Sequence, residues 1–162
     1  MGITSLTFFG WSCSASYSFT GASISPEIKT ISIDFFPSYA SLAPPTASQL
    51  FTEALRDVFL SQTNLVPVKS GGDIEFEGAI VNYRTSPVAI QGNETAALTR
   101  VSMTVKVKFT NNYDEKQSFE TSFSRFEDFE TSQDLSTVEE ELLSSINSQL
   151  TQDIFNKAVT NW

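Results

Sequence analysis

Apolar and polar residues alternate along several stretches of the chain, which is the pattern of strands buried on one face. The clearest stretch is Thr99–Thr110, where every second residue from Val101 to Phe109 is apolar and the residues between them are polar. Three other stretches show weaker alternation: 28–36, with Ile31, Ile33 and Phe35 on one face, 73–84 and 118–126. The pattern predicts four strands, the last three joined as a meander.

Two further segments have apolar residues at the spacing of one helix face. The first follows Thr46-Ala-Ser-Gln49, which has the sequence of a capping box, and is expected to end near Thr63. The second follows Ser136-Thr-Val-Glu139, another capping-box sequence, and is expected to reach Thr160. The order β-α-β-β-β-α predicts a single-domain α+β fold with both helices packed on one face of a four-stranded mixed sheet.

Three segments between these elements are predicted to be loops. Pro37–Pro45 contains a Pro-Pro pair that cannot continue a strand ladder, and 126–130 is acidic and aromatic. The connector 85–97 is more apolar than a solvated loop. Exposed apolar residues on a loop often mark a partner contact, although folding of the connector back onto its own sheet would explain the same composition.

Composition restricts the classes of function. The net charge of −9 argues against broad nucleic-acid binding, which needs a basic surface. The absence of histidine excludes Ser-His-Asp and Cys-His catalysis and imidazole metal sites, and a single cysteine cannot form an internal disulfide. No apolar run reaches the roughly 18–20 residues of a transmembrane helix.

No pattern of residues indicates an active site, a metal site or a cofactor. Phosphate-binding loops and nucleophile elbows are absent from the sequence. Glu75 and Glu77 could form an acid pair, but an ordinary charge ladder with Lys106 and Lys108 across the sheet is favoured. We therefore expect a protein that is not an enzyme.

A row of cations is expected on the sheet face that the helices leave open. Arg100, Lys106 and Lys108 should lie there together with Tyr83, beside serine and threonine side chains. Charge-assisted hydrogen bonds from such cations could bind lipid phosphates. The alternative is the charge ladder described above, in which the same lysines have only a structural role.

The first twelve residues are similar to the C-terminal part of an export signal. The apolar run from Ile3 to Trp11 is followed by Ser12 and then by Cys13, the cysteine that a lipoprotein signal peptidase would leave for lipidation. Gly10 replaces the expected leucine, and no basic residue precedes Lys29. A buried or free thiol is the alternative interpretation of Cys13. Residues 13–27 would be a tether and 28–162 the folded domain.

Several strings resemble one family. Tyr17-Ser-Phe-Thr-Gly-Ala-Ser-Ile24 lies just behind Cys13, and the resemblance continues at 51–57, 83–88 and 153–159. Together they resemble the Bacteroidetes-type LptE family, small lipoproteins of lipopolysaccharide assembly. The match covers most of the chain from Tyr17 onward and contains no catalytic motif.

The resemblance implies a role as a scaffold. The protein would be lipid-anchored through Cys13 on the periplasmic side of the outer membrane, where it would assemble with and plug a large LptD-type β-barrel that delivers lipopolysaccharide. The loops 37–45 and 85–97 would be the parts that enter the barrel. Two alternatives are a periplasmic lipoprotein that binds a glycolipid or small apolar ligand alone, in a cavity between helices and sheet, and an unanchored subunit of another envelope complex.

Overall fold

The computed structural model describes residues 24–88 and 97–159. The signal-like segment 1–12, Cys13 and most of the 85–97 connector therefore lie outside the described residues. The elements in chain order are β1 (Thr30–Ile33), α1 (Ala47–Gln62), β2 (Val66–Val68), β3 (Ile74–Pro87), β4 (Leu98–Asn111), a 3-10 turn η1 (Glu115–Gln117), β5 (Phe119–Glu130) and α2 (Leu135–Val159).

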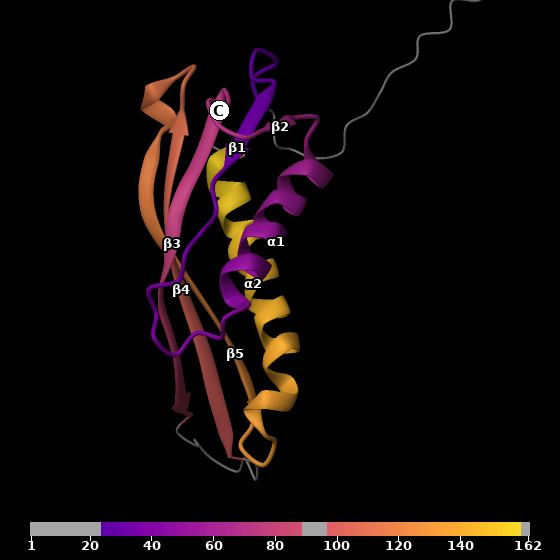
Figure 1. The fold of residues 1–162 in the computed structure, drawn as a ribbon, viewed down its shortest axis with the longest axis vertical. Helices are drawn as coiled ribbons and strands as arrows, with labels where there is room; N and C mark the ends of the chain where they lie inside the picture. The colour runs from indigo at the N-terminus through magenta and orange to yellow at the C-terminus, as the bar shows by residue number, and fades with distance from the viewer. Residues whose placement is uncertain (1–23, 89–96, 160–162) are drawn as a thin grey trace, which may run out of the picture.

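The strands form one mixed sheet that both helices cover on the same face (Figure 1). Its order is β2-β1-β3-β4-β5, with β1 parallel to both of its neighbours and β3, β4 and β5 antiparallel. The α+β class, the mixed sheet and the meander are confirmed. The expected number of strands was too low, because β2 spans only three residues around Pro67 and has no alternation to read.

A row of phenylalanine rings crosses the layer between the sheet and the helices. The Phe59 ring lies 4.7 Å from the ring of Phe76 and 5.1 Å from that of Phe155, measured between centroids. The row continues from Phe76 to Phe109 at 4.9 Å and then to Phe119 at 5.1 Å. These separations are those of favourable aromatic pairs. One run of contacts thus joins α1, α2 and the three long strands.

A β-bulge in β3 changes which residues in the second half of the strand face the helices. The register with β4 shifts between Ile80 and Asn82, and Val81 is 41% exposed. An extra residue at a bulge reverses the alternation beyond it. Tyr83 is consequently only 4% exposed, and its hydroxyl donates a hydrogen bond to Glu139 at 2.8 Å. The prediction that Tyr83 lies on the open face is wrong.

Strand ends also differ from the prediction. The sequence predicts a loop at 126–130, but these residues continue β5 because they pair with the start of β4, as Phe129 does with Thr99. β1 stops at Ile33, so the expected alternation breaks there: Phe35 is 58% exposed and Phe36 is buried.

Neither predicted capping box forms. Thr46 makes no side-chain hydrogen bond at the start of α1, and the amide of Gln49 binds Glu53 one turn later. α2 begins earlier than expected, where the carboxylate of Asp134 accepts a hydrogen bond from the Ser136 N–H at 3.0 Å. Ser136 therefore lies inside the helix and is not its N-cap, and the carboxylate of Glu139 accepts the Tyr83 hydroxyl.

Replacing Phe76 by alanine should lower the free energy of unfolding by about 3–5 kcal/mol, because a ring that contacts both Phe59 and Phe109 leaves a cavity. The matched control is Phe35→Ala, which removes an exposed ring and should change stability by less than about 0.5 kcal/mol. Urea unfolding followed by circular dichroism measures both variants, and equal losses would contradict the assignment of the core.

Candidate functional site

The cations predicted for the open sheet face all point there, and each is paired with a carboxylate. Lys108 donates to Glu77 on β3 at 2.7 Å, and Lys106 forms an ion pair with Glu120 on β5. Arg100 makes two hydrogen bonds to Asp128, at 2.7 and 2.8 Å. The central carbon of its guanidinium group lies 3.6 Å from the centroid of the Phe126 ring.

These pairs shift the pKa values of several of the groups in them. The hydrogen bond to Glu77 raises the pKa of Lys108, and the hydrogen bond from Lys106 lowers the pKa of Glu120. The Asp128 carboxylate in the same way raises the pKa of Arg100. The raised pKa values keep Lys108 and Arg100 charged at neutral pH, beside the carboxylates that cause the shifts.

The charge-ladder interpretation of the open face is confirmed for Lys108, which faces Glu77 across β3 and β4. Lys106 is paired with β5 instead, and Glu75 accepts a hydrogen bond from Asn112. A lipid phosphate that binds these lysines would compete with the carboxylates for their positive charge. Exposed ion pairs contribute little stability, so that exchange would cost little.

The loop between β1 and α1 presents three large apolar side chains to solvent. Phe35, Tyr39 and Leu42 are 58%, 75% and 70% exposed. The loop is nevertheless held against β3, because the Tyr39 N–H donates to the Ile80 carbonyl and the Ile80 N–H donates to the Pro37 carbonyl, both at 2.9 Å. Large apolar side chains exposed on a fixed loop are typical of a partner contact.

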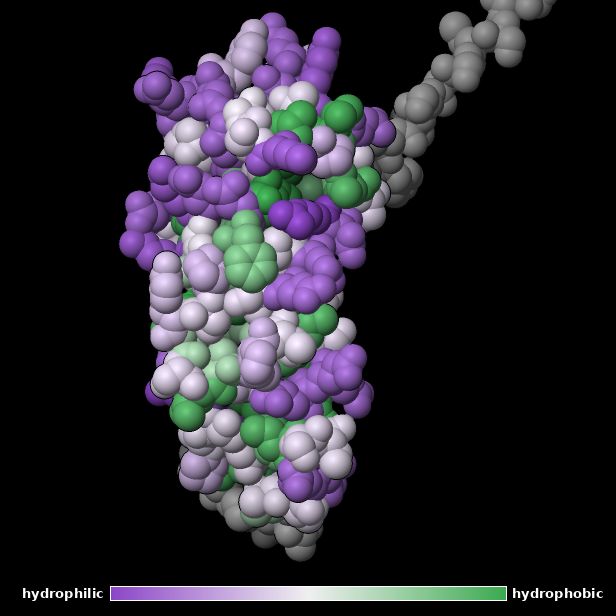
Figure 2. Space-filling view, viewed as in Figure 1, coloured by the Kyte–Doolittle hydropathy of each residue, from purple (hydrophilic) through white to green (hydrophobic). Residues whose placement is uncertain are grey.

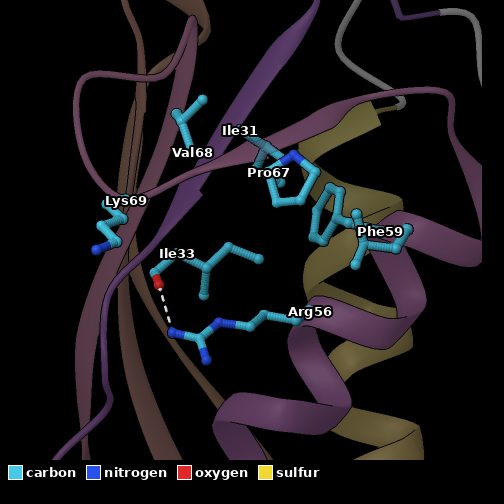
Figure 3. A pocket seen from close by; sticks show the side chains of 8 residues that line it. Ile31, Ile33, Arg56, Phe59, Pro67, Val68 and Lys69 are labelled. Carbon is cyan, nitrogen blue, oxygen red and sulfur yellow. Dashed lines mark hydrogen bonds between the residues drawn. The ribbon is translucent and has the colours of Figure 1, made fainter.

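A cleft of about 380 Å³ opens between α1 and the β1–β2 edge of the sheet (Figure 3). Ile31, Ile33 and Phe59 form its apolar floor, and Pro67 and Val68 border it on the side of β2. Figure 2 shows hydrophobic surface in a hollow of this region with hydrophilic side chains around it. The cleft cannot be predicted from a local sequence pattern, because its lining residues come from three separate elements.

Two cations border the cleft. Arg56 projects from α1 and donates to the Ile33 carbonyl at 2.9 Å, and Lys69 lies at the opposite border with its ammonium group turned outward (Figure 3). In the described part of the chain, neither side chain forms an ion pair with a carboxylate. They differ in this respect from Arg100, Lys106 and Lys108.

Asp73 fixes the turn that carries Lys69. Its Oδ2 atom accepts the N–H groups of Lys29 at 2.8 Å and Thr30 at 2.9 Å, and these bonds lower the pKa of Asp73 below its ordinary value. Because the folded-state pKa is the lowered one, the stabilisation is present above the ordinary pKa and is lost as the pH falls through the folded value. At neutral pH this border of the cleft is held in place.

Within residues 24–88 and 97–159, no three potential metal ligands come together. None of the helices among those residues has the length and apolar character needed to cross a membrane.

Comparison with known proteins identifies similar sequences and folds. The family model for lipopolysaccharide assembly, LptE, matches residues 28–158. No curated protein matches the sequence.

The fold is similar to rare lipoprotein B from Shewanella oneidensis, with 14% identity, a TM-score of 0.53, and coverage of 82% of this chain and 96% of that one. A hypothetical protein from Chlamydia trachomatis has 12% identity and a TM-score of 0.53, over 83% and 99% of the two chains. Both structural similarities concern the fold alone.

The variant Lys106→Met should raise the pKa of Glu120 toward its ordinary value, because it removes both the hydrogen bond and the positive charge that lower that pKa. A carbon-13 NMR titration of the carboxyl groups measures the change. Lys116→Met, which removes an exposed cation from η1, is the control and should leave Glu120 unchanged. An unchanged pKa in Lys106→Met would contradict the ion pair.

Proposed function

Because the chain belongs to the LptE family of lipopolysaccharide-assembly proteins, we propose that it is a non-catalytic lipoprotein of the outer membrane that assembles with an LptD-type β-barrel and plugs it during lipopolysaccharide delivery. The observation that carries this proposal is the extent of the family match, residues 28–158, which covers every described strand, all of α1 and all of α2 except its last residue. The finer Bacteroidetes-type assignment stays a prediction from the sequence.

The proposed anchor is a lipid on Cys13, held on the periplasmic side of the membrane. Figure 1 shows the described chain beginning near one end of the long axis, whereas β3 ends and β4 begins at the other. A tether attached at the first end would leave the end of β3 and the start of β4 free to face a barrel. This arrangement supports the expectation that the 85–97 connector inserts into the lumen.

The exposed apolar loop supplies a second proposed contact with the barrel. Phe35, Tyr39 and Leu42 would become buried when the barrel wall closes around the protein, and the hydrogen bonds between the loop and Ile80 would hold them in position beforehand. A surface that is already ordered loses little conformational freedom on binding.

The first test is purification of the full-length protein from native outer membrane in mild detergent. A large β-barrel should copurify in stoichiometric amount, and a photo-crosslinker placed at Tyr39 should attach to it. Cys13→Ala should release the protein from the membrane fraction, whereas Ser14→Ala, which leaves the cysteine intact, should not.

Three results would contradict parts of this proposal. A protein that is anchored but arrives alone would exclude the plug and favour a lipoprotein that binds its ligand by itself. A native protein without acyl groups on Cys13 would favour an unanchored envelope subunit. Crosslinks confined to surfaces other than Tyr39 would exclude the loop contact.

We further propose that Lys106 and Lys108 bind the phosphates of lipopolysaccharide by exchanging them for Glu120 and Glu77. The double variant Lys106→Gln/Lys108→Gln should weaken lipopolysaccharide binding at least tenfold, because two charge-assisted bonds are lost. Lys29→Gln/Lys116→Gln removes the same charge elsewhere and should bind normally. Binding that survives in the first variant would make the row of cations purely structural.

A further inference from the structure

We propose that the cleft between α1 and the β1–β2 edge binds an anionic amphiphile with a single acyl chain, its carboxylate or phosphate head held by Arg56 and Lys69. This inference concerns a different surface from the row of cations on the open face and does not depend on a barrel partner.

The size of the cleft sets the size of the ligand. Its volume of about 380 Å³ lies near the lower limit for small-molecule sites, roughly 300–1,000 Å³. One acyl chain fits such a space, whereas a glycolipid with several chains does not. The opening to solvent, beside the partly exposed Leu60, leaves room for a head group outside the apolar floor.

The walls of the cleft suit a hydrocarbon chain. The floor is made by Ile31, Ile33 and Phe59, whose side chains are held in place by packing against the rest of the core. No carboxylate is among the lining residues. Affinity should therefore increase with chain length, by roughly two- to fourfold per methylene group, until the cleft is full.

Charge selects the head group. The protein carries a net charge of −9, and ion pairs with carboxylates occupy Arg100, Lys106, Lys108 and Arg125. The two cations at the cleft have no such partner among the described residues. An anion would complete their charge balance, which a zwitterionic or cationic head would not do.

Arg56 is the better placed of the two. Its hydrogen bond to the Ile33 carbonyl uses one of the five guanidinium N–H donors and fixes the group beside the floor, so the remaining donors are available to a carboxylate or phosphate. Lys69 reaches the same head group by rotation of its flexible side chain. Arg56 should therefore contribute more to affinity than Lys69.

Isothermal titration of the full chain with dodecanoate, dodecyl phosphate and dodecyltrimethylammonium, each below its critical micelle concentration, tests the proposal. We expect saturable binding of the anions and not of the ammonium compound. Equal affinities for the two anions would indicate a site that recognises charge alone, and a preference for dodecyl phosphate would indicate that phosphate is the natural head group. Shorter chains, from six to ten carbons, should bind progressively more weakly.

Variants locate the binding. Arg56→Gln should weaken dodecanoate binding at least tenfold and Lys69→Gln about two- to fivefold, whereas Lys116→Gln should bind as the unaltered protein does. Val68→Phe keeps both cations but narrows the cleft, and it should weaken the twelve-carbon probe more than the six-carbon one. Circular dichroism shows whether each variant is folded. Equal binding of the ammonium compound, or equal affinities of folded Arg56→Gln and Lys116→Gln, would overturn the proposal.

Discussion

The contact of Phe59 with both Phe76 and Phe155 determines how the rest of the molecule is arranged. It joins the two helices to each other and to the central strand, and the row of rings extends the same layer to β5. The cleft lies beside this contact, because Phe59 also forms part of its floor, and the three-residue strand β2 borders it on the other side.

Much of this fold follows from periodicity alone. The strict alternation of 99–110 identified β4, and the order of elements was enough to place both helices on one face. The errors arose where tertiary contacts outweigh a local pattern. The bulge in β3 turns Tyr83 inward toward Glu139, and Asp134 starts α2 before the predicted capping box.

The candidate sites differ in how far sequence could reveal them. Alternation placed Lys106 and Lys108 on the open face and suggested Glu77 as a partner, because directly opposed residues share a face. Whether a cation is paired depends on residues distant in sequence, as Lys106 with Glu120 illustrates. The cleft combines Ile33, Arg56 and Val68 from three elements, so no local pattern contains it. Cys13 is the opposite case, since its assignment depends on sequence alone.

The order of strands has a consequence for how the chain folds as it emerges. β1 lies between β2 and β3, so its Ile31 has no complete set of neighbours until Ile74 is available. The ring contact between Phe59 and Phe155 can form only later, because Phe155 lies close to the end of α2. Such long-range contacts slow folding. A chain that leaves the ribosome or crosses a membrane from its N-terminus therefore cannot complete its core until nearly all of it has passed.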